Sequence, residues 1–275
     1  MAVRSGEASN LKLKGVAYDD SEDDEGKSHD NEGEEEKALS DLLGRSLKLG
    51  SSKKLLVLTL GGVLVHRVYR RMRCSDYKAD TYKGHRADLI VGNFLVFKRP
   101  YVEEFMKFCF ERFEVGMWSS AMVHNTDDVL SMIMGGLKNK LLFVWDQKKC
   151  SNTHFKSLEK ADKPIFVKEL SKLWAGGQTL PRKPGKFSAS NTLLIDDEPY
   201  KALRNPPNTA IFPHTYKVDN GSDDFLGPDG ELKQFLDGLA EAEDVPSYVK
   251  DHPIGQPPIT DSHPDWDFYS KIRGY

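Results

Sequence analysis

Cysteine is scarce in this sequence of 275 residues. The three cysteines, Cys74, Cys109 and Cys150, cannot all pair with one another, and no two of them have the CxxC spacing of redox and zinc motifs. This pattern argues against a disulfide framework and against a structural zinc site. It favours a reducing compartment.

Long hydrophobic runs are also absent. The most apolar stretch, residues 55–65, has eleven residues and includes two glycines, whereas a membrane-spanning helix needs about 20. The amino terminus has no apolar signal segment, and from Asp19 onward it is too acidic for a mitochondrial transit peptide. We therefore expect no membrane insertion and a nuclear or cytoplasmic location.

Charge is unevenly distributed along the chain. Residues 19–36 contain eleven acidic residues and one lysine, a local charge of −10, so the rest of the chain carries +7 of the total of −3. Residues 1–50 are polar and poor in aromatic side chains, and they cannot bury enough apolar surface to offset the entropy of ordering. The sequence predicts a disordered acidic arm over residues 1–50.

Beyond this arm, apolar strands alternate with amphipathic helices. The continuous run Leu55–Leu58 predicts a strand buried on both faces, and the spacing of Val102 to Phe113 after Pro100 predicts a helix. Further strands are expected at 114–118, 141–145, 192–195 and 209–212, and further helices after Thr126, over 165–174 and over 232–239. The alternation predicts an α/β fold with a Rossmann-like, doubly wound parallel sheet over residues 51–250. Residues 251–275 are expected to be an extended tail that packs on the domain or follows it.

Polar side chains follow four of the expected elements. They are the turn Thr59–Gly62, Ser119 with Ser120, Lys168, and the pair Asp196 and Asp197. In open parallel sheets, ligands bind beyond the carboxyl ends of the strands. A hydroxyl, a lysine and two carboxylates at that edge form a constellation suited to phosphate and a metal ion.

The order of these groups resembles the haloacid-dehalogenase-like phosphatases. More narrowly, it resembles the branch homologous to phosphatases of the RNA polymerase C-terminal domain, also called NLI-interacting-factor-like. The resemblance covers about residues 53–250 and rests on five stretches in order: 55–66 (LLVLTLGGVLVH), 97–100 (FKRP), 115–120 (VGMWSS), 167–173 (VKELSKL) and 193–200 (LLIDDEPY). The first stretch is also similar to the degenerate motif of the receptor subunit of the mitochondrial presequence translocase, from the same branch.

The resemblance implies a role for each site residue. The family's first motif, Asp-x-Asp-x-Thr, supplies the nucleophile and the general acid and base, and these two positions are Thr59 and Gly61 here. Ser119 matches the residue that hydrogen-bonds the phosphoryl group, and Lys168 matches the lysine that neutralises phosphate and nucleophile. Asp197 matches the position that holds Mg²⁺, with Asp196 beside it as a weaker candidate ligand.

Without a carboxylate at either position of the first motif, the family mechanism should fail. Covalent phosphoryl transfer needs an activated nucleophile, and acid–base assistance contributes roughly 10²–10⁴-fold. We therefore predict a pseudophosphatase, with weakened Mg²⁺ affinity, that acts by binding a protein or phosphoprotein. The alternatives are an active Mg²⁺-dependent Ser/Thr phosphoprotein phosphatase and a mitochondrial subunit of the inner-membrane presequence translocase.

Residues 67–86 are basic, with seven lysines and arginines interleaved with three tyrosines. The segment falls where the family places a flap beside the active site. It predicts a basic flap insertion, which is either a solvated loop, a surface for an acidic or phosphorylated protein, or a dock for the chain's own acidic arm. Nucleic acid is disfavoured as a partner, because the excess of +7 is small and no recognition motif accompanies it.

Overall fold

The computed structural model describes residues 53–70, 80–121, 126–159, 161–175 and 185–274. These residues belong to one compact unit, Ser52–Tyr275. The expected disordered arm over residues 1–50 lies outside the described residues.

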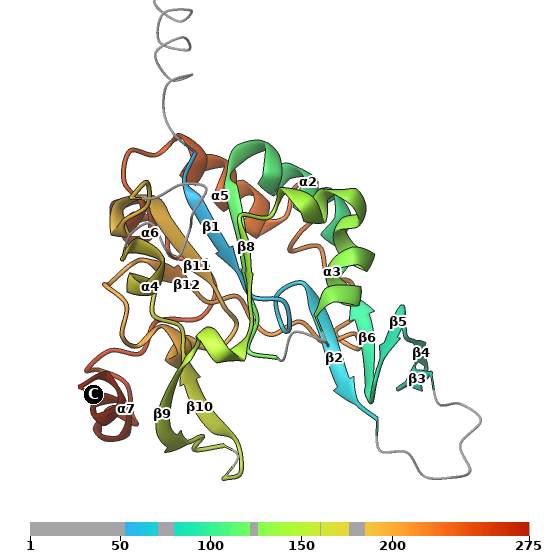
Figure 1. Ribbon diagram of the computed structural model, residues 1–275, viewed down its shortest axis with the longest axis horizontal. Coiled ribbons are helices and arrows are strands. Elements are labelled where there is room, and N and C mark those ends of the chain that lie inside the picture. The colour runs from blue at the N-terminus through green and yellow to red at the C-terminus, as the bar shows by residue number, and fades with distance from the viewer. Residues whose placement is uncertain (1–52, 71–79, 122–125, 160, 176–184, 275) are drawn as a thin grey trace, which may run out of the picture. The chain divides into compact units, whose positions relative to one another are not determined.

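A five-stranded sheet forms the centre of this unit (Figure 1). Its strand order is β12-β11-β1-β7-β8, and every neighbouring pair is parallel. The strands are β1 (Leu55–Leu58), β7 (Glu114–Trp118), β8 (Phe143–Trp145), β11 (Thr192–Ile195) and β12 (Ala210–Ile211). The predicted α/β fold with a parallel sheet is confirmed, and the predicted strands lie within two residues of the observed ones.

The central strand β1 divides the core into two layers. Its residues are all inaccessible to solvent, and Leu56 and Leu58 pack in one apolar cluster while Leu55 and Val57 pack in the other. The first layer receives α2 (Val102–Arg112), α3 (Asp127–Met134), α5 (Glu231–Glu241) and α6 (Val245–Asp251). The second receives α4 (Ser171–Trp174) and the aromatic side chains of β7 and β8. Side chains of a strand point alternately to its two faces. Because both faces of β1 are covered by apolar clusters, every residue of this strand has to be apolar.

Helix α2 buries the residues that its amphipathic spacing predicts. Val102, Phe105, Met106 and Cys109 are buried on the sheet, as the pattern predicts. Burying side chains of this size contributes roughly 1.5–3 kcal/mol each. Phe108, which does not fit the apolar spacing, still packs partly against the same cluster.

Two insertions leave the central sheet on the side where β1 ends (Figure 1). The first is an antiparallel sheet of β2 (Val65–Tyr69), β6 (Phe94–Lys98) and β5 (Leu89–Val91), followed outward by the short pair β3 (Thr81–Tyr82) and β4 (His85–Arg86). It contains the described part of the expected basic flap, and residues 71–79 of that flap lie outside the described residues. The second is a hairpin of β9 (Ser151–Lys156) and β10 (Pro164–Val167).

The hairpin overturns the prediction of one helix over 165–174. Ile165 and Val167 are buried and Pro164 is exposed, which is the alternation of a strand with one covered face. Pairing with β9, a polar strand that was not expected, satisfies the backbone of β10. Helical structure is confined to α4. The prediction failed because the apolar spacing within a segment does not reveal whether another strand pairs with it.

The carboxyl-terminal segment also differs from its prediction. Instead of an extended tail, α6 is followed by α7 (Trp266–Arg273), whose Ile272 is fully buried against Ile165 and Leu203. The helix was not predicted because α7 consists mainly of polar and aromatic residues, with Ile272 as its one buried side chain. No helix among the described residues is long and apolar enough to cross a membrane.

Candidate active site

The candidate site lies at the carboxyl edge of the parallel sheet. Leu58 of β1 pairs with Met117 of β7 and with Ile195 of β11, so the residues that follow these strands emerge side by side. Thr59 continues the ladder, because its N–H donates to Ile195 O at 3.0 Å. The sheet therefore brings the turn after β1, the serine after β7 and the aspartate pair after β11 to one edge.

Lys168 reaches this edge from the β9–β10 hairpin. Its Nζ lies 2.5 Å from Thr59 Oγ1 and 2.6 Å from Asp196 Oδ2, and it donates to both oxygens. Thr59 Oγ1 in turn donates to the same Asp196 Oδ2 at 2.7 Å. All three side chains are buried, and those of Lys168 and Asp196 are inaccessible to solvent. The Thr59 hydroxyl, at the position that the resemblance assigns to the nucleophile, thus bridges a buried ammonium and a buried carboxylate.

A second buried lysine, Lys201, was missed in the sequence. It lies on the 3-10 helix η5 (Pro199–Ala202), and its Nζ contacts Asp196 Oδ1 at 3.1 Å and Glu198 Oε2 at 2.8 Å. Its carbonyl oxygen accepts the N–H of Lys168 at 2.8 Å, which fixes the two lysines relative to each other. The only signal in the sequence was the i,i+3 spacing of Glu198 and Lys201, a common spacing for surface pairs.

The two lysines decide the charge of Asp196. Burial alone raises the pKa of this carboxyl, but the attraction of Lys168 and Lys201 outweighs it and the pKa lies well below the usual 3.8. Burial lowers the pKa of Lys168, and Asp196 counteracts that effect. For Lys201, three carboxylates overcome burial and raise the pKa well above 10.5. Asp196 is therefore an anion held by two cations.

Asp197 has a different environment. Burial and the neighbouring Asp196 raise its pKa from 3.8 to about 6. Its Oδ2 accepts a hydrogen bond from Thr215 Oγ1 at 2.9 Å, and Gln256 Nε2 donates to its carbonyl oxygen at 3.0 Å. Asp197 is consequently less well compensated than Asp196, although the two are adjacent.

The two glycines of the first turn are not equivalent. Gly62 has φ +80°, and a Cβ at this position would lie 1.9 Å from Asp197 Oδ2. A side chain here is excluded by both the left-handed backbone and the aspartate. At Gly61 a Cβ would meet nothing closer than Arg67 Cδ at 4.0 Å, so the backbone leaves room for the side chain that is missing there.

Ser119 is placed by two hydrogen bonds at the end of β7. Its N–H donates to Trp145 O at 2.8 Å, and its Oγ accepts the N–H of Ala121 at 3.0 Å. Because the backbone donates to Oγ, the hydroxyl proton remains available for an acceptor such as a phosphoryl oxygen.

A divalent cation does not fit these residues. Magnesium prefers carboxylate and carbonyl oxygens in an octahedral arrangement, but both oxygens of Asp196 already accept hydrogen bonds, from Lys168 and Thr59 on one side and from Lys201 and the Glu198 N–H on the other. Asp197 Oδ1 is left as a single anionic ligand. Within the described ranges, no group of three or more His, Cys, Asp and Glu side chains could hold a metal ion.

The described part of the flap contributes one cation next to the turn. Arg67 lies beside Gly61, and its guanidinium is 4.5 Å from the ring centre of Phe94. Farther out, Lys83 forms an ion pair with Asp219, and Arg86 Nε lies 3.0 Å from Asp80 Oδ2. Two of the basic residues that suggested an acidic partner are thus already paired within the chain.

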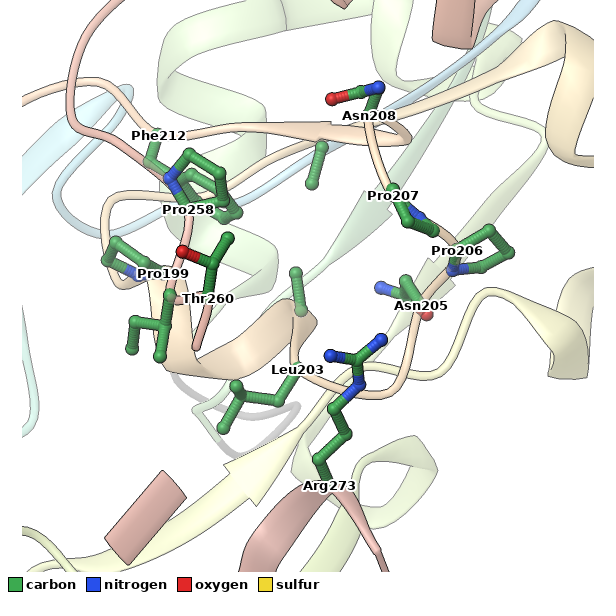
Figure 2. Close-up of a pocket in the computed structure, with 13 residues that line it drawn as sticks. Pro199, Leu203, Asn205, Pro206, Pro207, Asn208, Phe212, Pro258, Thr260 and Arg273 are labelled. Carbon is green, nitrogen blue, oxygen red and sulfur yellow. The ribbon is translucent and has the colours of Figure 1, made fainter. Parts of the chain in front are cut away.

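A separate cavity of about 140 Å³ is lined by residues of η5 and of the segment that follows it (Figure 2). Its walls are mainly apolar and include Pro199, Leu203, Pro206 and Pro258, with Arg273 of α7 as the charged side chain. None of its lining residues belongs to the cluster of lysines and carboxylates. The cavity is therefore not part of the candidate active site.

Comparisons with known proteins show to which family this fold belongs. Residues 54–246 match the family described as NLI interacting factor-like phosphatase. A probable C-terminal domain small phosphatase of Dictyostelium discoideum is 26% identical over 193 residues, which cover 70% of this chain and 52% of that protein. The human carboxy-terminal domain RNA polymerase II polypeptide A small phosphatase 1 is 25% identical over 211 residues, covering 76% and 68%.

The chain spans about half the length of the Dictyostelium relative and 36% of a similar Caenorhabditis elegans protein, CTD small phosphatase-like protein 1. Among solved structures, Fcp1, an essential RNA polymerase II CTD phosphatase, is 15% identical, with a TM-score of 0.38 and coverage of 86% of this chain and 65% of that one. The family match extends over most of the chain and includes all five motifs from which the resemblance was predicted. This chain belongs to the NLI-interacting-factor-like branch of the haloacid-dehalogenase-like phosphatase family.

Proposed function

We propose that this domain is a pseudophosphatase that acts by binding a protein or phosphoprotein. The observation that carries the proposal is the hydroxyl of Thr59, which occupies the nucleophile position and bridges Lys168 and Asp196. A carboxylate nucleophile is ionised at neutral pH, whereas a threonine hydroxyl attacks phosphorus only when a neighbouring base removes its proton.

Asp196 contacts the Thr59 hydroxyl, but it is a poor base. Its pKa is held far below the usual range by two buried ammonium groups, and a general base works best with a pKa near the operating pH. Gly61 has no side chain that could protonate a leaving group. Turnover through an aspartyl-phosphate therefore has neither its nucleophile nor its acid and base.

The groups that would hold a phosphoryl oxygen are still present. Ser119 keeps a free hydroxyl proton at the strand end, and Lys168 supplies a positive charge beside Thr59 at the same edge of the sheet. The names of two relatives describe small phosphatases of a C-terminal domain, and the name of the human relative specifies RNA polymerase II. A phosphorylated protein segment is accordingly the ligand class that we propose for this chain.

Hydrolysis assays test the loss of catalysis. We expect p-nitrophenyl phosphate and phosphoserine peptides to release no more phosphate with the wild type and Mg²⁺ than with Thr59→Val, which has a similar shape and no hydroxyl. The double variant Thr59→Asp with Gly61→Asp restores both carboxylates, and we expect it to hydrolyse the same substrates. Phosphate release by the wild type above the Thr59→Val level would contradict the proposal.

Binding assays test the proposed role. A phosphoserine peptide library and its unphosphorylated counterpart are compared by fluorescence anisotropy. We expect the phosphorylated peptides to bind more tightly and Ser119→Ala to lose roughly ten- to a hundredfold in affinity, the value of one hydrogen bond to a charged group. Ser131→Ala, on the exposed face of α3, is the matched control. Equal binding of both libraries would limit the domain to partners without phosphate.

The relatives' names also bear on location. Because the name of the human relative refers to RNA polymerase II, we expect the protein in the nucleus or cytoplasm, with unmodified protein or phosphoprotein as its partner. Fractionation of cells that express the full chain tests this expectation, and recovery in mitochondria would favour the translocase alternative.

A further inference from the structure

We infer that this site is a charge-balanced cluster that holds no divalent cation, and that the buried ammonium of Lys201 supplies the positive charge that a metal ion would supply. The charge balance of the cluster does not depend on whether the domain binds a phosphoprotein.

The inner cluster contains equal numbers of positive and negative groups. Lys168 and Lys201 are the two cations, and Asp196 and Asp197 are the two anions, all nine-tenths or more buried. Glu198 forms a further pair at the rim, where Lys163 and Lys201 both contact it. With three lysines and three carboxylates, the whole group is neutral at neutral pH.

The two buried lysines approach Asp196 from opposite sides. Lys168 contacts Oδ2 at 2.6 Å and Lys201 contacts Oδ1 at 3.1 Å. Buried charges are tolerated only when they are paired and hydrogen-bonded, and here every oxygen of Asp196 meets that condition. Nothing in this arrangement requires a further cation.

A divalent ion would disturb the balance. It would place two positive charges in a buried region that is already neutral, next to the Lys201 ammonium, and its single remaining anionic ligand would be Asp197. Interactions between charges are strong in such water-poor surroundings, so the repulsion from Lys201 is not screened as it would be at the surface.

The absence of carboxylates at positions 59 and 61 changes the charge of the cluster in the same direction as the presence of Lys201. With aspartate at positions 59 and 61, the same cluster would carry two additional negative charges, and a divalent cation would neutralise them. Thr59 and Gly61 remove both charges. The loss of the two carboxylates and the presence of Lys201 therefore have the same electrostatic result, a cluster that is neutral without metal.

Thermal unfolding and calorimetric titration of the full chain with MgCl₂ and MnCl₂ test the inference, with NaCl of matched ionic strength as the control. For the wild type we expect the same Tm in either metal salt as in NaCl, and no saturable heat. A saturable heat, or a metal-specific rise in Tm, would overturn the inference.

Two variants make the test independent of folding defects. Lys201→Met keeps the length of the side chain and removes its charge, so we expect a lower Tm in metal-free buffer and partial recovery with Mg²⁺. Thr59→Asp with Gly61→Asp retains Lys201 and should gain a Mg²⁺-dependent rise in Tm even if Lys201→Met does not fold. Absence of a Mg²⁺ response in the double variant would overturn the charge argument.

Lys172→Met is the matched control. It removes a lysine from the neighbouring helix α4 whose ammonium donates to Lys149 O and to the Ser151 hydroxyl. We expect it to show no Mg²⁺ response. A response equal to that of Lys201→Met would mean that any lost positive charge has this effect, which would refute the specific role of Lys201.

Discussion

Asp197→Asn is expected to stabilise the protein at neutral pH. The Asp197 carboxyl is buried beside the Asp196 carboxylate, and these two influences raise its pKa from 3.8 to about 6. Asparagine has nearly the same shape, carries no charge and can still accept the hydrogen bond from Thr215 Oγ1. The substitution removes the cost of burying the charge and leaves the packing in place.

The size of the stabilisation and its pH dependence follow from the Asp197 pKa values of 3.8 in the unfolded state and about 6 in the folded state. The folded state binds the Asp197 proton more tightly than the unfolded state, so this group contributes stability below pH 3.8 and loses it as the pH rises through about 6. A difference of about two pKa units corresponds to about 3 kcal/mol at pH 7.5 and, by the same linkage relation, to about 1 kcal/mol at pH 4.5. We expect Asp197→Asn to exceed the wild type in unfolding free energy by amounts of that order at the two pH values.

Urea denaturation at the two pH values measures this difference. Asp229→Asn, at an exposed position before α5, controls for the general effect of removing one negative charge. A destabilised Asp197→Asn variant, or a difference that does not change with pH, would refute the reasoning. Either result would show that the ionised Asp197 carboxylate does not carry the burial cost that its raised pKa implies.

Three further substitutions test the packing around the site, each by the midpoint of urea unfolding. Gly62→Ala should lower the free energy of unfolding by about 1–3 kcal/mol, because the new Cβ would adopt a left-handed backbone conformation and lie 1.9 Å from Asp197 Oδ2. Gly61→Ala should leave the free energy of unfolding nearly unchanged. Equal effects of the two substitutions would contradict the difference between the two glycines. Lys168→Met should cost about 3 kcal/mol by leaving a buried carboxylate with one cation, and a neutral result would mean that the ion pair is not formed. Asp223→Ala should lower the free energy of unfolding by about 3–5 kcal/mol, because buried Arg99 loses its two 2.8 Å hydrogen bonds to the carboxylate. A loss below about 1 kcal/mol would mean that this pair contributes no more than a surface salt bridge.

The sequence predicted those parts of the fold that depend on local pattern. Leu55–Leu58 is buried on both faces as its uninterrupted apolar run required, and α2 buries the stripe that its spacing marked. The strand ends were predictable for the same reason, because parallel strands bring the residues after them to one edge. The order of Thr59, Ser119 and Asp196 along the chain was therefore sufficient to place them together.

The parts that failed depend on partners distant in sequence. Residues 164–167 form a strand because β9 pairs with them, and nothing within those residues distinguishes this from the start of a helix. Lys201 was overlooked for a related reason. A lysine is almost never buried unless it is paired, and its partner Asp196 had already been interpreted as a weak candidate metal ligand.

The contacts of Lys168 and Asp196 explain why threonine suits position 59. In the family, the lysine of the third motif neutralises an aspartate at this position, so replacement of that aspartate by an apolar residue would leave Lys168 with one partner fewer. A hydroxyl can accept a hydrogen bond from the ammonium and donate one to Asp196, and the distances of 2.5 and 2.7 Å show that Thr59 does both. A carboxylate could only accept, and it would repel Asp196 across the same short distance. The threonine thus completes a buried hydrogen-bond network with Lys168 and Asp196, and this network needs no carboxylate at position 59.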